Sequence, residues 1–235
     1  MQHRPGAARS KERVVMYVGP TMAPSPRARA LARGSVRVRP PVRRLDVAKL
    51  VEAEREPGVL VIVDGVFHDK LAVGHAEIRD AIDAGWQVWG LSSMGAIRAR
   101  EMAPLGMRGF GRVFERFMGE EDFQDDEVAL LHEGTAPYRA VTEPLVHLRA
   151  AIGHLVERGI VTETDATAVV ADLKSRWFGE RTVRGTIEAL VRRAREAADA
   201  IRREMSDFRR FALKTSDLER FLEQQPWSIE RGGTR

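Results

Sequence analysis

The chain has 235 residues, of which 43% are hydrophobic and 31% are charged. It is therefore long and apolar enough to form one large domain, or one domain with an extension. It contains no cysteine, which excludes disulfides, persulfide chemistry and thiolate metal ligands. The sequence has neither a secretory hydrophobic region nor a run of about 18 apolar residues, and it therefore predicts a cytoplasmic protein without a membrane span.

Charge is distributed unevenly along the chain. Residues 1–44 contain eleven Arg or Lys and one acid, Glu12, so this segment carries +10; the total is +4, and the difference leaves −6 for the rest. Such a basic arm can bind nucleic acid or an acidic protein. Tyr17 is its only aromatic residue, which offers little for bases to stack on. A solvated tail is the preferred interpretation, and nucleic-acid binding is not expected.

The first clear secondary-structure signal follows a polar stretch. Residues 1–13 are expected to form a disordered basic tail. The run Val14–Val18 predicts a buried strand, which ends at the breaker pair Gly19 and Pro20. The next elements are predicted as a helix over 26–33, a half-exposed strand over 35–39 and a helix over 46–56 capped by Asp46.

A repeated alternation of strand and helix follows. The continuous apolar run 59–63 ends at Asp64 and predicts a parallel strand that is buried on both faces. The elements after it are predicted as a helix over 74–84, a strand over 86–90 and a helix over 96–103. Strands and helices joined by short links form βαβ units. The sequence therefore predicts an α/β fold with a small parallel sheet flanked by helices.

Beyond residue 105 the pattern becomes helical. Helices are predicted over 111–118, 126–132 (with Asp125 as the cap), 143–158 and 163–176. From Val183 to Ala212 apolar residues recur every three or four positions, which predicts one long helix whose stripe packs in the core or docks a partner. The predicted organisation is a tail over 1–13, an α/β core over 14–150 and a helical extension over 151–235.

The segment Gly90–Gly95, which reads G-L-S-S-M-G, lies between a strand and a helix. A serine at such a turn can be a nucleophile beside backbone amides that form an oxyanion hole. The same amides can instead bind an anion, or the serine can simply cap the helix. The spacing is not the full G-x-S-x-G pattern, and it does not choose between Ser92 and Ser93.

A nucleophilic serine needs a base, and the base needs an orienting carboxylate. Asp64 ends the preceding strand, at the sheet edge where ligands of open α/β sheets bind. His75 and Glu77 open the next helix; His75 is the preferred base and His68 the second choice. Arg98 lies in the first turn after the serines, where it can neutralise an anionic substrate.

An acidic run over 115–127 holds seven acids against Arg116 alone. Clustered carboxylates can hold Mg²⁺ or Ca²⁺, but the spacing matches no calcium loop and lacks the glycine that an EF-hand requires. A solvated loop that starts a helix is therefore preferred, and no metal site is expected.

Six segments follow one another in a recognisable order. They are Val18–Thr21 (V-G-P-T), Val63–Phe67 (V-D-G-V-F), His75–Ile78 (H-A-E-I), Gly90–Arg98 (G-L-S-S-M-G-A-I-R), Asp125–Ala129 (D-D-E-V-A) and Glu143–Val146 with Arg149. Together they resemble the TfuA-like family. The chain departs from the family pattern at Ala76, Gly74 and His147, where lysine, tryptophan and asparagine are common. If that lysine acts in the family, Arg98 or Lys70 would replace it here.

The resemblance implies a role beside YcaO-type cyclodehydratases, which activate a backbone amide with ATP and admit a sulfur nucleophile. The chain would deliver sulfide from a ThiS-like ubiquitin-like carrier by hydrolysing the thiocarboxylate at its C-terminal glycine, and no cofactor is implied for the chain itself. Direct attack by water is an alternative to a covalent serine. The competing interpretation is a non-catalytic adaptor that docks the carrier on a YcaO protein and activates it allosterically.

Together these arguments assign expected roles to twelve residues. The expected catalytic residues are Ser92, Ser93, His75, Asp64 and Glu77. The expected substrate-binding residues are Gly19, Pro20, Thr21, Gly65, Met94, Gly95 and Arg98.

Overall fold

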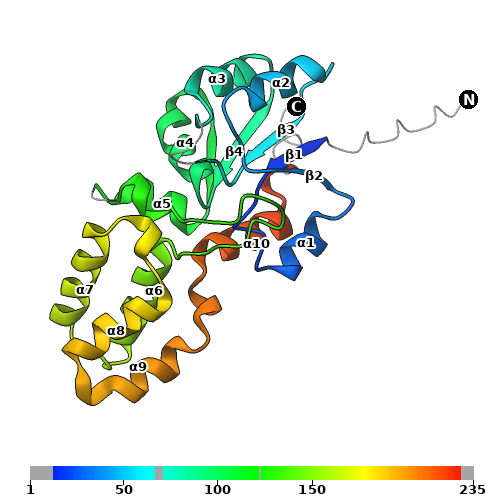
Figure 1. Ribbon diagram of the computed structural model, residues 1–235. Helices are drawn as coiled ribbons and strands as arrows, with labels where there is room; N and C mark the ends of the chain where they lie inside the picture. Colours follow the sequence, from blue (N-terminus) through cyan, green and yellow to red (C-terminus); the bar gives the residue numbers. More distant parts are fainter. Residues whose placement is uncertain (1–12, 67–70, 122, 229–235) are drawn as a thin grey trace, which may run out of the picture.

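The computed structural model describes residues 13–66, 71–121 and 123–228 (Figure 1). Apart from Arg13, the predicted tail lies outside these residues. Within them, the centre of the fold is a five-stranded sheet in the order β2-β1-β3-β4-β5, in which every pairing is parallel. The strands are β1 Val14–Tyr17, β2 Val36–Arg39, β3 Val59–Ile62, β4 Gln87–Leu91 and β5 Arg108–Phe110. The predicted α/β fold is confirmed.

The strand order reverses between β1 and β3, which are both buried along their whole length. Their register pairs Val14 with Val59 and Tyr17 with Ile62. In open parallel sheets a crevice forms outside the carboxyl ends of the strands at such a reversal. The loops after β1, β3 and β4 therefore meet at the edge where a ligand is expected to bind.

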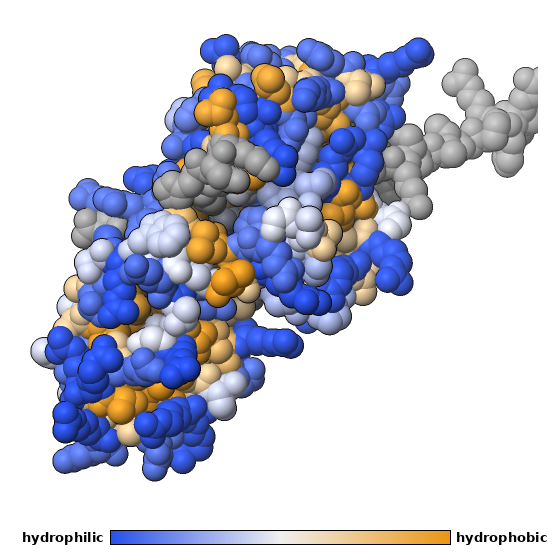
Figure 2. Space-filling model, in the orientation of Figure 1, coloured by the Kyte–Doolittle hydropathy of each residue, from blue (hydrophilic) through white to orange (hydrophobic). Residues whose placement is uncertain are grey.

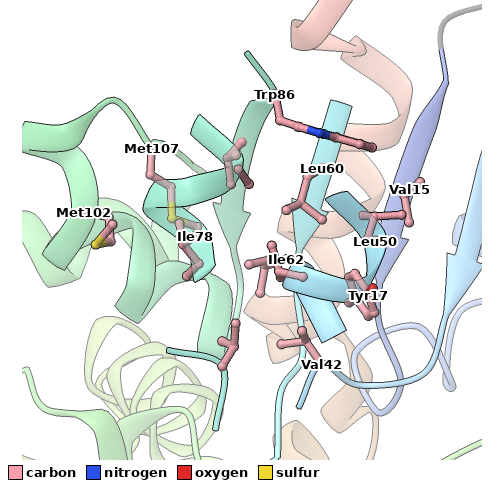
Figure 3. Close-up of a cluster of buried hydrophobic side chains, with 14 of the residues drawn as sticks. Val15, Tyr17, Val42, Leu50, Leu60, Ile62, Ile78, Trp86, Met102 and Met107 are labelled. Atoms are coloured by element: carbon pink, nitrogen blue, oxygen red, sulfur yellow. The ribbon is translucent and has the colours of Figure 1, made fainter. Parts of the chain in front are cut away.

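Helices cover both faces of the sheet. On one face α2 Asp46–Ala53, α3 His75–Asp83 and α4 Met94–Met102 pack on alternate strand residues, and Figure 3 shows this cluster with Leu60 and Ile62 at its centre. On the other face lie α1 Pro26–Ala32 and α10 Leu213–Gln224. Helix α5 Arg112–Gly119 packs on α4.

A second group of helices lies apart from the sheet and has its own core (Figure 1). It contains α6 Leu145–Glu157, α7 Glu163–Ser175, α8 Val183–Arg193 and α9 Ala198–Met205. Figure 2 shows apolar residues between hydrophilic ones on the surface of this region. No described helix is both long and apolar enough to cross a lipid bilayer.

The predicted long helix from Val183 to Ala212 is wrong. The chain breaks at Ala194, whose φ of −122° and ψ of 64° are not helical, and it breaks again after Met205. The apolar residues of this segment do recur as predicted. Their side chains come from several short helices and pack with those of α6 and α7, so they do not form one stripe on a straight helix. Helix α10 then returns to the sheet, although it belongs to the segment 151–235; the division at residue 150 stays a prediction.

The predicted helix over 126–132 is also wrong, because only a short 3-10 turn forms, over Asp125–Glu127. Glu127 is fully buried, and both of its carboxylate oxygens accept hydrogen bonds from Arg149 at 2.7–3.0 Å. Asp126 accepts a bond of 2.7 Å from the buried Arg181. These ion pairs fasten the acidic run to the helical region, so the run is not simply a solvated loop.

Candidate functional site

Asp64 follows β3 and holds the loop after β1. One oxygen, Oδ2, accepts hydrogen bonds from the backbone N–H groups of Gly19 at 2.8 Å and Thr21 at 2.9 Å. The other, Oδ1, accepts a bond of 2.6 Å from Thr21 Oγ1. Asp64 is 1% exposed, so its carboxylate is engaged on the inside of the fold. The structure therefore joins three of the predicted residues, but it gives Asp64 the role of a loop clamp.

Strand β4 enters α4 through the two serines. Ser92 has a φ of 64°, which is unusual for a residue with a side chain, and its buried Oγ donates a hydrogen bond of 2.8 Å to the carbonyl of Lys214. Ser93 is the N-cap residue of α4 and is 3% exposed. Within the described part of the chain, neither Ser93 Oγ nor the amide of Met94 has a hydrogen-bond partner. The turn thus presents one uncommitted hydroxyl and one uncommitted amide.

Two glycines allow this turn to form. A Cβ atom on Gly90 would lie 2.0 Å from the carbonyl oxygen of Gly95, and one on Gly95 would lie 1.8 Å from the carbonyl oxygen of Ile62. The Gly95 amide also donates a bond of 3.2 Å to the Val63 carbonyl. The start of α4 is therefore pressed directly against the backbone of β3 and β4.

His75 and Arg98 lie in a separate cluster across α3 and α4. Nε2 of His75 is 2.8 Å from Glu101 Oε2, and the same oxygen accepts a bond of 2.7 Å from the Arg98 guanidinium. Among the described contacts of His75, none reaches Asp64 or a serine. The structure thus does not support the expectation that Asp64 orients His75; Glu101 occupies that position instead. His68 and Lys70 lie outside the described residues.

Glu77 joins the ends of two helices. Its carboxylate accepts hydrogen bonds from the amides of Leu45 and Val47, at the start of α2, and of Gly74, at the start of α3, over 2.8–3.1 Å. Negative charge at helix N-termini is stabilising. Glu77 is 6% exposed and therefore supports the fold beneath the site.

Sequence reasoning missed a group of side chains that α6 and α10 bring to the end of β1. His147 Nε2 accepts a bond of 3.2 Å from the Lys214 amide, and its Nδ1 lies 3.2 Å from Glu143. The Lys214 ammonium donates to the Val128 carbonyl at 3.0 Å, and Thr215 Oγ1 donates to the carbonyl of Thr21 at 2.9 Å. His147 appeared in the sequence only as a departure from a family pattern.

A cavity of about 330 Å³ opens beside these residues, between the loop after β1 and the start of α10. Thr21, Glu143, His147, Lys214 and Thr215 all line it. Burial lowers the pKa of Lys214 below the usual 10.5, against the opposing effect of Asp64 and Glu143. Burial likewise lowers the pKa of His147 below the usual 6.5, against the opposing contact with Glu143.

The buried histidine should make stability depend on pH. In the unfolded chain His147 takes up a proton near its ordinary pKa of 6.5, whereas in the fold it does so only at lower pH. Its contribution to stability is therefore present above pH 6.5 and is lost as the pH falls below it, by at most about 1.4 kcal/mol per pH unit. Urea unfolding from pH 7 to 5 should show a shallower loss for His147→Asn than for the wild type. Equal slopes would contradict this.

Comparison with known proteins agrees with the motifs around the serine turn. The family model described as TfuA-like protein matches residues 64–182, just over half of the 235 residues. This range includes Asp64 and the serine turn and extends beyond residue 150, whereas Val18–Thr21 lies outside it. No curated protein shows significant similarity to the chain. The chain belongs to the TfuA-like family.

Proposed function

We propose that this protein serves YcaO-dependent thioamidation of peptide backbones by hydrolysing the C-terminal thiocarboxylate of a ThiS-like carrier. Membership of the TfuA-like family supports this role. The absence of cysteine is consistent with it, because the chain cannot relay sulfur as a persulfide. Sulfide is then released by breaking an acyl–sulfur bond, which requires a site for acyl transfer.

The observation that carries the proposal is the uncommitted Oγ of Ser93 at the N-terminus of α4. In the proposed reaction Ser93 Oγ, or a water that it holds, attacks the thiocarboxylate carbon. The C–S bond breaks, sulfide leaves, and water hydrolyses any acyl-serine to the carboxylate. The Met94 amide is suited to stabilise the oxyanion. His75 is the proposed base and would act through a water, because no described contact joins it to Ser93; its partner Glu101, 2.8 Å away, is suited to orient the ring.

One observation favours the adaptor as a second candidate function. Ser92 and Ser93 are 0% and 3% exposed, so the carrier tail would reach them only if the surrounding loops moved. An adaptor needs no such access, because it would bind the carrier and the YcaO protein on its surface.

Sulfide release from a thiocarboxylated ThiS-like carrier, measured with the YcaO protein present, tests both candidates. We expect Ser93→Ala and His75→Ala each to lower the rate about 100-fold or more, while both variants still fold. Ser206→Ala is the matched control, because Ser206 is exposed and its described hydrogen bonds go to the carbonyl of Arg203 within its own helical turn. Unchanged sulfide release in Ser93→Ala, with saturable carrier binding, would reject the hydrolase and support the adaptor.

A further inference from the structure

The cavity at the end of β1 has a second feature, which is its charge. In addition to the buried Lys214, two exposed arginines line it, Arg139 and Arg209. Among the described residues that line the cavity, Glu143 is the one acid, and it is already 3.2 Å from His147. We call this space the basic cavity. It lies beyond the end of β1, which is one of the two strands between which the strand order reverses, and ligands of such sheets usually bind near a reversal.

The cations of the basic cavity are largely uncommitted. Within the described part of the chain, the guanidinium groups of Arg139 and Arg209 form no ion pair and donate no hydrogen bond. The Lys214 ammonium has three hydrogens but one acceptor there, the Val128 carbonyl. By contrast, the exposed Arg184 is paired with Glu188 at 2.9 Å. Three cations around one engaged carboxylate leave a net positive cavity that is suited to an anion.

The rest of the lining of the basic cavity is mostly apolar. It consists of Pro20, Ala23, Pro24, Leu130, Ala140, Phe208 and Ala212. Such walls suit an anion that carries uncharged groups behind its charge, as the end of a peptide chain does. The hydroxyl oxygens of Thr21 and Thr215 donate elsewhere but can still accept hydrogen bonds from the N–H groups of such a chain. Guanidinium groups bind carboxylates in a bidentate manner, which suits the end of a peptide.

We infer that the basic cavity binds the carboxyl-terminal end of a peptide chain, and that Arg139 and Arg209 receive its terminal carboxylate. This inference rests on the proposed function only for the identity of the chain, which would be the tail of the carrier after its sulfide has left. The cavity then holds the tail at the same sheet edge as the serine turn, to which Lys214 is joined through the 2.8 Å bond from Ser92.

Binding of labelled peptides to the full-length protein tests this inference. The probe is a short N-terminally labelled peptide that ends in Ala-Gly-Gly with a free carboxylate, and its partner is the same peptide with a C-terminal amide. We expect the carboxylate form to bind at least 10-fold more tightly. The double variant Arg139→Gln/Arg209→Gln should lower its affinity at least 10-fold. Both arginines are exposed, so the variant is expected to fold.

The matched control is Arg184→Gln/Arg192→Gln, which removes two exposed arginines from α8, away from the sheet; its affinity should equal that of the wild type. Equal binding of the two peptides, or unchanged binding by the Arg139/Arg209 variant, would overturn the inference. Displacement of the peptide by equal concentrations of inorganic phosphate would reassign the cavity to free anions. The peptides contain no thiocarboxylate, so their binding is independent of whether the protein releases sulfide.

Discussion

Replacing Gly95 with alanine is expected to destabilise the fold by about 3 kcal/mol or more, because the new Cβ has no space. It would lie 1.8 Å from the carbonyl oxygen of Ile62, which belongs to the backbone of β3 and cannot rotate away. Either the start of α4 moves outwards and loses the bond from the Gly95 amide to Val63, or β3 is displaced. Both changes also disturb the serine turn, so sulfide release should fall together with stability.

The matched control is Gly153→Ala, in the middle of α6, where a Cβ would meet no atom within 4 Å. Alanine is the better helix former, so this variant should gain about 0.5–1 kcal/mol. Urea or thermal unfolding of both variants measures the contrast. If Gly95→Ala is as stable as the wild type, the close contact between α4 and β3 is wrong.

Asp64→Ala is the second change for which we expect a large effect, a loss of about 3–5 kcal/mol in the free energy of unfolding. The carboxylate accepts three hydrogen bonds, from the amides of Gly19 and Thr21 and from the Thr21 hydroxyl. A buried donor left without its acceptor costs about 1–3 kcal/mol, and the three losses are not fully additive. Asp64→Asn keeps the volume and one acceptor oxygen, so it should cost less, about 2 kcal/mol.

Asp80→Ala is a suitable comparison, because the Asp80 side chain is 66% exposed and its nearest cation, on Arg79, is 3.7 Å away. Its effect on stability should stay within about 0.5 kcal/mol. Equilibrium unfolding, combined with sulfide release at a temperature where all variants are folded, separates two roles for Asp64. A variant that keeps wild-type stability but loses activity would show that Asp64 acts in the chemistry and is not a clamp.

The strands of the sheet could be predicted from the sequence wherever a buried strand leaves a run of apolar residues. Residues 59–63 form a continuous apolar run because β3 is covered on both faces. β5 gave no such signal, since Arg108, Gly109 and Phe110 are a strand only through their pairing with β4. After Val183 apolar residues do recur with the period of a helix. That period does not show where a helix ends, so it could not predict the break around Ala194.

The candidate site was predictable only in its local parts. Asp64 and the serine turn can be recognised in the sequence, because each follows a predicted strand and precedes a predicted loop or helix. Their partners are distant in the chain: the bond from Ser92 reaches Lys214 across 122 positions, and the bond from the Lys214 amide reaches His147 across 67. Nothing in one sequence marks such pairs. Asp64 was placed at the correct sheet edge, but its acceptor role toward Thr21 depends on the loop after β1 folding back.

Because α10 returns to the sheet, the stretch that identifies the family and the set of residues that form the core of the sheet are not the same part of this protein. The stretch that identifies the family, residues 64–182, contains only β4 and β5 of the sheet. The strands that complete the core precede it, and the helix that covers one face, with Phe221 buried against Trp89, comes after it. The family stretch therefore does not contain the whole of the sheet or of the helices that cover it. To complete the core of the sheet, the protein needs residues from both ends of the described chain.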